Sequence, residues 1–153
     1  MKSSVYVVLG EYYPVKPWKA WRIGRDLTQM THYIGLVPHE DPKHGPEPHA
    51  SWVDKSLHAQ VRRFNLNGQG GSWHQDGDTT PGSRMDCAMV LWSNVAPTLF
   101  KSTTDNKIYQ PKPYEVVLVR NLSCYHRRPD NAPYERWLFR QRIALPARIG
   151  GLD

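Results

Sequence analysis

The sequence contains few cysteines and no long hydrophobic run. Its two cysteines, Cys87 and Cys124, do not form a CxxC pair, which argues against both a disulfide scaffold and a zinc ribbon. The longest apolar run near the start, Val5–Leu9, is too short for a membrane span or for the core of a signal peptide. We therefore expect a soluble, intracellular and cytoplasmic protein that makes no membrane contact and has two reduced, mostly buried thiols.

The chain has 153 residues, a length typical of one domain, with no internal repeat and no low-complexity segment. Lys and Arg outnumber Asp and Glu by 20 to 14, which gives a formal net charge of +6. This basic balance favours a polyanionic partner, nucleic acid in particular. An ordinary basic surface explains the charge equally well.

Short strand-like runs separated by frequent turns indicate an all-β fold with minor helix, either a sandwich or a barrel. A short helix beginning near Asp26 is predicted within residues 24–37, followed by a proline-rich loop over residues 38–49. The predicted strands cover residues 1–13, 60–67, 85–95, 107–110, 114–119 and 134–145, and residues 97–102 are expected to continue the third of them after a bend.

The stretch Ser72–Asp78 carries the main chemical signal. His74 and Asp76 are two residues apart, so on an extended backbone their side chains point to the same face and converge. A third ligand is available from His126, near the end of an apolar strand-like run. Two histidines and one carboxylate on one face of a metal leave the opposite face open, an arrangement that suits non-haem Fe(II) and O2 chemistry.

Three other interpretations of these residues remain open. Asp78 could replace Asp76 as the carboxylate ligand, although on an extended strand it would lie about 13 Å from His74, and a turn-stabilising role suits it better. Zinc could occupy the same three ligands. A histidine beside an aspartate is also often only a structural hydrogen bond.

Arginines gather on one face of the last predicted strand, where Arg136, Arg140 and Arg142 lie with Leu138. The other face carries Trp137, Phe139, Gln141 and Ile143. An exposed sheet face would explain them simply. Alternatively, an arginine reaches into the barrel and pairs bidentately with a carboxylate. A zinc hydrolase would not require such a strand.

The order of these elements resembles that of the Fe(II)/2-oxoglutarate-dependent dioxygenases. The matched pieces are WHQDGD, VLWSNVAPTLF, YQPKPYEVVLVRN with YHRRP, and RWLFRQR. They cover Gln60–Leu145, and so predict a core at residues 60–145 of one domain that spans residues 1–153. A His-x-Asp pair alone is a weak signal, whereas four elements in the right order are considerably more specific.

The resemblance implies a double-stranded β-helix, the jelly-roll or cupin-like fold, with a catalytic Fe(II) bound by His74, Asp76 and His126. It further implies that 2-oxoglutarate binds nearby. Arg136 would form a salt bridge with the distal carboxylate of this cosubstrate, with Arg140 or Arg142 in support. Asn65 resembles a position that often contacts it.

The implied activity is oxidation of a substrate C–H bond, by hydroxylation or oxidative demethylation, while O2 and 2-oxoglutarate yield succinate and CO2. The HQD and FRQ pieces are similar to those of alkylation-repair demethylases, which act on nucleic acid. The stretch YHRRP…ERWLFRQ is equally similar to small prolyl-hydroxylase-like and phage-encoded oxygenases, which favours a protein or peptide substrate. The alternative is an inactive jelly-roll module with a binding or structural role, for example a viral one.

Overall fold

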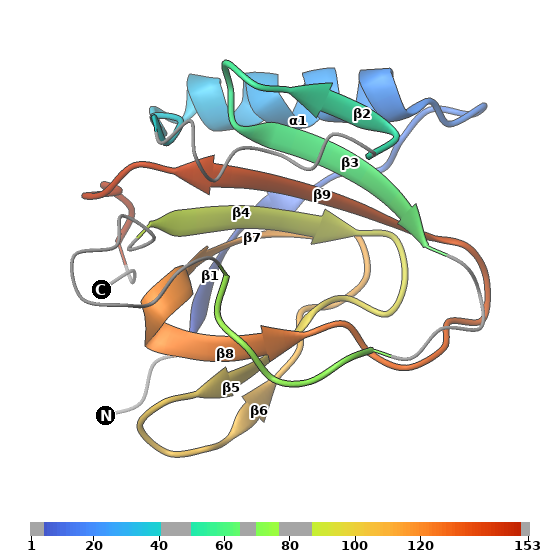
Figure 1. Cartoon of the computed structure of the whole chain (residues 1–153). Helices are drawn as coiled ribbons and strands as arrows, with labels where there is room; N and C mark the ends of the chain where they lie inside the picture. The colour runs from blue at the N-terminus through green and yellow to red at the C-terminus, as the bar shows by residue number, and fades with distance from the viewer. Residues whose placement is uncertain (1–4, 41–49, 65–69, 77–86, 151–153) are drawn as a thin grey trace.

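The computed structural model of the chain describes residues 5–40, 50–64, 70–76 and 87–150. This part of the protein is mostly β, as the sequence predicts, with one helix over the outer face of a large sheet and a smaller sheet beyond its other face (Figure 1). No helix in these ranges is long and apolar enough to cross a membrane.

All strand pairs are antiparallel, and within the described ranges they form a six-stranded sheet of order β1-β7-β4-β9-β3-β2 and a three-stranded sheet of order β6-β5-β8. The elements in chain order are β1 (Tyr6–Glu11), α1 (Ala20–Tyr33), β2 (Trp52–Asp54), β3 (Ala59–Phe64), β4 (Ala88–Ser93), β5 (Leu99–Ser102), β6 (Ile108–Tyr109), β7 (Glu115–Arg120), the 3-10 helix η2 (Asn121–Ser123), β8 (Cys124–Arg127) and β9 (Arg136–Ile143).

Helix α1 is longer than predicted and begins at Ala20 rather than near Asp26. Its buried residues Ile23, Leu27 and Thr31 recur every four positions, which is the spacing of a helix face against a sheet. The residue before the helix, Lys19, makes no side-chain cap hydrogen bond, so no capping signal marks the true start in the sequence. Packing against the sheet, rather than a cap, therefore determines where this helix begins.

Two hydrophobic cores lie on opposite faces of the large sheet. On the helix side, Trp137 and Phe139 of β9 pack with Trp92 of β4 and with the apolar face of α1. Between the sheets lies a second core, which includes both cysteines as buried thiols that form no disulfide within the described ranges. The prediction of two reduced, mostly buried thiols is confirmed for the described part of the chain.

Two connections differ from the sequence prediction. Residues Leu99–Ser102 do not continue β4 but form β5 in the smaller sheet, because the chain turns at Ala96, which has a φ of 44°. Likewise His126 does not end the apolar strand β7, since η2 interrupts the chain and β8 then joins the smaller sheet. The residues before and after each turn therefore belong to opposite sheets.

Candidate metal centre

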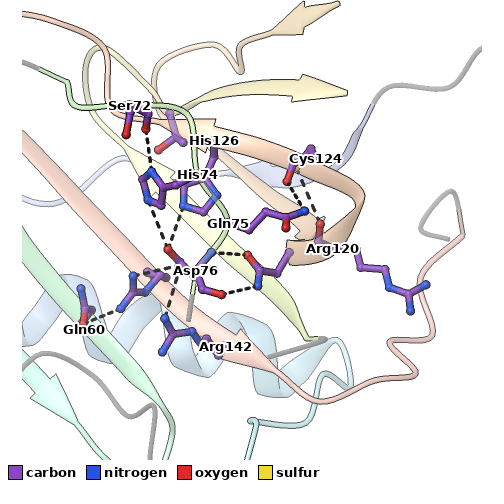
Figure 2. Close-up of polar contacts among 12 residues, drawn as sticks. Gln60, Ser72, His74, Gln75, Asp76, Arg120, Cys124, His126 and Arg142 are labelled. Carbon is purple, nitrogen blue, oxygen red and sulfur yellow. Dashed lines mark hydrogen bonds and ion pairs between the residues drawn. The ribbon is translucent and has the colours of Figure 1, made fainter. Parts of the chain in front are cut away.

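Three side chains predicted to act together converge between the two sheets. One possible ligand atom from each of His74, Asp76 and His126 lies within 4.8 Å of the others. The Nε2 atoms of His126 and His74 are 3.1 Å and 3.7 Å from Oδ1 of Asp76 (Figure 2). The structure thus brings the His-x-Asp pair and the distant histidine to one point.

A backbone bridge aligns the two histidines. The His74 amide donates to the His126 carbonyl at 3.1 Å, and the His126 amide donates back to the His74 carbonyl at 2.8 Å. In such an antiparallel pair the two side chains stand next to each other on one face. Their ring centroids are accordingly only 4.5 Å apart.

The orientation of the His74 ring suits a metal ligand. Its Nδ1 lies 2.8 Å from the Ser72 carbonyl oxygen, which can only accept, so Nδ1 carries the proton and donates it (Figure 2). In the neutral ring the Nε2 lone pair then faces the Asp76 carboxylate, and two acceptors facing each other are favourable only with a cation, either a proton or a metal ion, between them. A metal ion meets this requirement, and a carbonyl that fixes the tautomer is common behind metal-binding histidines.

The two oxygens of the Asp76 carboxylate have different partners. Oδ1 faces the histidines, whereas Oδ2 accepts from Arg140 at 3.3 Å and lies 3.5 Å from a guanidinium nitrogen of Arg142. Burial alone would raise the pKa of Asp76, but the hydrogen bond to His126 and the nearby positive charges hold it well below its usual range. Asp76 therefore remains ionised, with Oδ1 directed at the position that a metal would take.

The arginines of β9 are held in place from the neighbouring strand. Arg140 also donates to the Oε1 atom of Gln60 on β3 at 3.2 Å, and Gln60 is only 2% exposed. Arg142 is 6% exposed. Both guanidiniums thus lie beside the candidate ligands rather than on an open sheet face, which excludes the simplest explanation of the arginine strand.

Asn121 is a site residue that sequence reasoning missed. Its Oδ1 accepts from the Asp76 amide and its Nδ2 donates to the Asp76 carbonyl, each at 3.0 Å. Asn121 is fully buried, and its own amide donates to the Cys87 carbonyl at 2.8 Å. The Asn121 side chain thus replaces a strand partner and fixes the backbone of the carboxylate ligand. Its only trace in the sequence is a polar residue directly after a buried strand.

Replacing Asn121 by alanine should weaken metal binding and lower the free energy of unfolding by about 2–4 kcal/mol, because two buried backbone groups lose their partners. We expect at least a roughly tenfold loss of Co(II) affinity, measured by titration of the visible absorption bands, alongside urea unfolding. Gln75→Ala is the matched control, since within the described ranges this neighbouring amide donates to the Leu122 and Cys124 carbonyls and not to Asp76. Wild-type Co(II) affinity in Asn121→Ala would contradict the role given to Asn121.

Arg136 lies on the same face of β9 but does not have a carboxylate partner among the described residues. Its Nε donates to the Ala96 carbonyl at 2.7 Å and one terminal nitrogen donates to the Thr98 hydroxyl at 3.1 Å. The other terminal nitrogen is buried and has no hydrogen-bond partner in the described ranges. Burial, together with the charge of Arg128, lowers the pKa of Arg136 to about 9. An anion is the partner that this guanidinium lacks.

Two candidate residues from the sequence cannot be placed in the site. Asn65, predicted to contact a cosubstrate, and Asp78, the alternative carboxylate ligand, both lie outside the described residues. The contacts of Asp76 with both histidines nevertheless agree with its choice as the carboxylate of the cluster.

The sequence matches no family model and no curated protein. The donor atoms of the three side chains are therefore what indicates which metal the site can bind. Two imidazole nitrogens and one carboxylate oxygen suit Fe(II) and also zinc. The His74 side chain is 51% exposed, so ligands can reach the cluster from solvent on this side.

Proposed function

We propose that this protein is an Fe(II)- and 2-oxoglutarate-dependent dioxygenase with a double-stranded β-helix fold, which oxidises a C–H bond of its substrate. The proposal is supported by two features that occur together on one face of β9. Arg140 and Arg142 contact the carboxylate of a His-Asp-His cluster, and Arg136 is a buried cation without a carboxylate partner among the described residues.

The path of the chain supports the proposed jelly roll. From β3 onward the strands alternate between the two sheets, since the His74 segment pairs with β8 of the smaller sheet before β4 returns to the larger one. The chain then passes through β5 and β6, back to β7, across to β8 and back to β9. This alternation is typical of a double-sheet jelly roll.

His74, Asp76 and His126 would hold Fe(II) through three positions on one side and leave the others for cosubstrate and O2. When bound, Fe(II) with 2-oxoglutarate supplies the O2 chemistry that converts the cosubstrate to succinate and CO2 and oxidises the substrate. Asn121 and the Ser72 carbonyl keep the ligand atoms in position before the metal arrives.

The arginines of β9 would supply positive charge for the two carboxylates of 2-oxoglutarate. Arg136 would pair with its distal carboxylate through the terminal nitrogen that now lacks a partner, while Thr98 keeps the guanidinium in place. Arg140 and Arg142 keep Asp76 ionised and supply positive charge near the carboxylate that binds beside the metal. Leu138, between Arg136 and Arg140 on the same face, offers an apolar contact for the carbon chain.

The test is succinate formation by purified protein supplied with Fe(II), 2-oxoglutarate and O2, together with anaerobic binding of 2-oxoglutarate in the presence of Mn(II). Wild-type protein should form succinate slowly without substrate, and His74→Ala should reduce this formation to background. His32→Ala is the control, because this histidine lies in the last turn of α1. Unchanged succinate formation in His74→Ala would remove the assignment of His74 as a ligand.

A second candidate is a binding or structural module without turnover. The contacts that favour it are those of Asp76 with Arg140, Arg142 and His126, which would stabilise the fold even without a metal. Wild-type protein that binds neither Co(II) nor Mn(II) with 2-oxoglutarate would support this candidate.

A further inference from the structure

A second cavity lies at one end of the large sheet, where β4 ends and where β7 and β9 begin. Its volume is about 720 Å³, and its walls include the aromatic side chains of Trp18, Tyr114, Tyr134 and Trp137. Trp137 belongs to the core on the helix side of the sheet, so this aromatic cavity lies on the face of β9 opposite Arg136. Its size is within the range of about 300–1,000 Å³ that is typical of ligand sites.

The aromatic walls meet at steep angles. The Trp18 ring stands at 90° to that of Tyr114, with centroids 6.4 Å apart, and at 79° to that of Trp137, with centroids 5.8 Å apart. Tyr134 completes the walls and is 51% exposed. Rings at right angles form corners, whereas a flat nucleobase gains most from a parallel face on which it can stack. The shape therefore favours a ligand with bulky, non-planar apolar rings.

Tyr114 is held at this cavity in a strained backbone conformation. Its φ is 70°, a value that bulky residues rarely adopt. Two backbone hydrogen bonds keep it there, since its amide donates to the Ser93 carbonyl at 2.8 Å and its carbonyl accepts from the Tyr12 amide at 3.0 Å. Glycine would fit this conformation without strain, and strained residues cluster at ligand-binding positions. The strained turn thus fixes an aromatic side chain in the wall of the cavity.

The free polar groups of the aromatic cavity are hydrogen-bond donors. Lys16 is exposed, and its ammonium can only donate. This ammonium and the hydroxyls of Tyr114 and Tyr134 have no hydrogen-bond partner within the described ranges. Burial raises the pKa of Tyr114, and the neighbouring Tyr134 raises it further. The Tyr114 hydroxyl therefore keeps its proton and can donate it to a ligand.

The acceptors in the same walls are already engaged. The Glu135 carboxylate accepts from Arg63 at 2.7 Å, and the side-chain oxygen of Asn94 accepts from the Trp137 amide at 2.7 Å. Arg63 also lies 4.5 Å from the centroid of the Trp137 ring, so a cationic ligand would meet a cation that is already in place. The aromatic cavity therefore suits a ligand that is rich in acceptors, poor in donors and not positively charged.

We propose that the aromatic cavity binds a proline-rich segment of a partner protein in the polyproline II conformation. Proline has a non-planar apolar ring and a carbonyl acceptor but no N–H donor. The polyproline II helix has no internal hydrogen bonds, so its carbonyls are available to Lys16 and to the two tyrosine hydroxyls. Its preformed shape also lowers the entropy cost of binding in an aromatic-lined groove. Sugar hydroxyls, by contrast, bring donors that would find few free acceptors here.

The proposed peptide site is independent of the candidate metal centre. Trp137 and Arg136 are neighbours on β9 and point to opposite faces of the sheet, so the peptide and the metal ligands lie on different sides. Peptide binding should therefore be the same with and without EDTA. A loss of binding on chelation would place the peptide at the metal centre and overturn the assignment to the aromatic cavity.

The test is fluorescence anisotropy with a fluorescein-labelled peptide of about nine prolines, which forms about three turns of the polyproline II helix. The variant is Tyr134→Ala, and its matched control is Tyr33→Ala, which removes a tyrosine that is 90% exposed at the end of α1. We expect Tyr134→Ala to lose at least about tenfold in affinity, because tyrosines are enriched among the side chains that dominate interfaces. Tyr33→Ala should lose less than about twofold. Tyr134→Phe should lose about two- to tenfold, since it removes one donor and keeps the ring.

Four further results would overturn the proposal. The first is no binding of the proline peptide by the wild-type protein, and the second is equally tight binding of an alanine–serine peptide with the same length and label. The third is an equal loss of affinity in Tyr134→Ala and Tyr33→Ala. The fourth is displacement of the labelled peptide by a maltooligosaccharide or a single-stranded DNA at a lower concentration than by the unlabelled proline peptide, which would assign the cavity to that class of ligand.

Discussion

Replacing Asp76 by alanine is expected to abolish metal binding and to lower the free energy of unfolding by about 3–5 kcal/mol. Asp76 is 9% exposed, and its carboxylate faces the half-buried guanidinium of Arg140 and the buried one of Arg142. Without it both guanidiniums lose a carboxylate partner in a poorly solvated space, and the histidines lose the ligand between them. Co(II) titration measures the first effect and urea unfolding the second.

The comparison variant His74→Ala should separate these two effects. His74 is half-exposed and its contact with Asp76 is the longer of the two histidine contacts, at 3.7 Å. We therefore expect it to lose metal binding while its free energy of unfolding changes by about 0.5 kcal/mol or less. If Asp76→Ala is as stable as His74→Ala, the carboxylate does not neutralise the arginines in the way that the contacts indicate.

Arg136→Met is expected to abolish cosubstrate binding while leaving the fold equally stable or more stable. Methionine has a similar length and no charge, and replacing a buried ion by a well-packed apolar side chain is often neutral or stabilising by about 1–4 kcal/mol. Binding of 2-oxoglutarate with Mn(II) should weaken at least a hundredfold, since an unpaired buried carboxylate costs roughly 3–5 kcal/mol. Isothermal calorimetry and thermal unfolding measure the two quantities.

Arg140→Met is the matched control, because Arg140 lies on the same face of β9 but has Asp76 and Gln60 as partners. It should destabilise the fold, since it leaves the buried Asp76 with one guanidinium fewer. A stability loss in Arg136→Met as large as that in Arg140→Met, with cosubstrate binding retained, would show that Arg136 is a structural residue.

Period-two geometry explains why the candidate ligands could be predicted locally. His74 and Asp76 needed only an extended backbone in order to converge, and the alternation in β9 separated the arginine face from the face of Trp137 and Phe139. The burial of Cys87 and Cys124 similarly followed from their apolar surroundings. All of these inferences depend on residues within a few positions of one another.

Contacts between distant segments could not be predicted in this way. The start of α1 depends on packing against the sheet, and the exclusion of Leu99–Ser102 from β4 depends on a turn at Ala96. The hydrogen bonds between the Asn121 side chain and the Asp76 backbone join residues 45 positions apart. Asparagine after a buried strand is common, so no local pattern distinguishes this one from an ordinary turn residue.

By itself, then, the sequence determined which side chains share a face on each strand, because backbone geometry sets that alternation. Only the tertiary structure decided which faces meet. It joined His74 to His126 through a backbone bridge, directed Arg140 and Arg142 to Asp76, and left Arg136 with neutral acceptors among the described residues. The physical reason is that sheet pairing and core packing bring together segments whose separation along the chain carries no information about their distance in space.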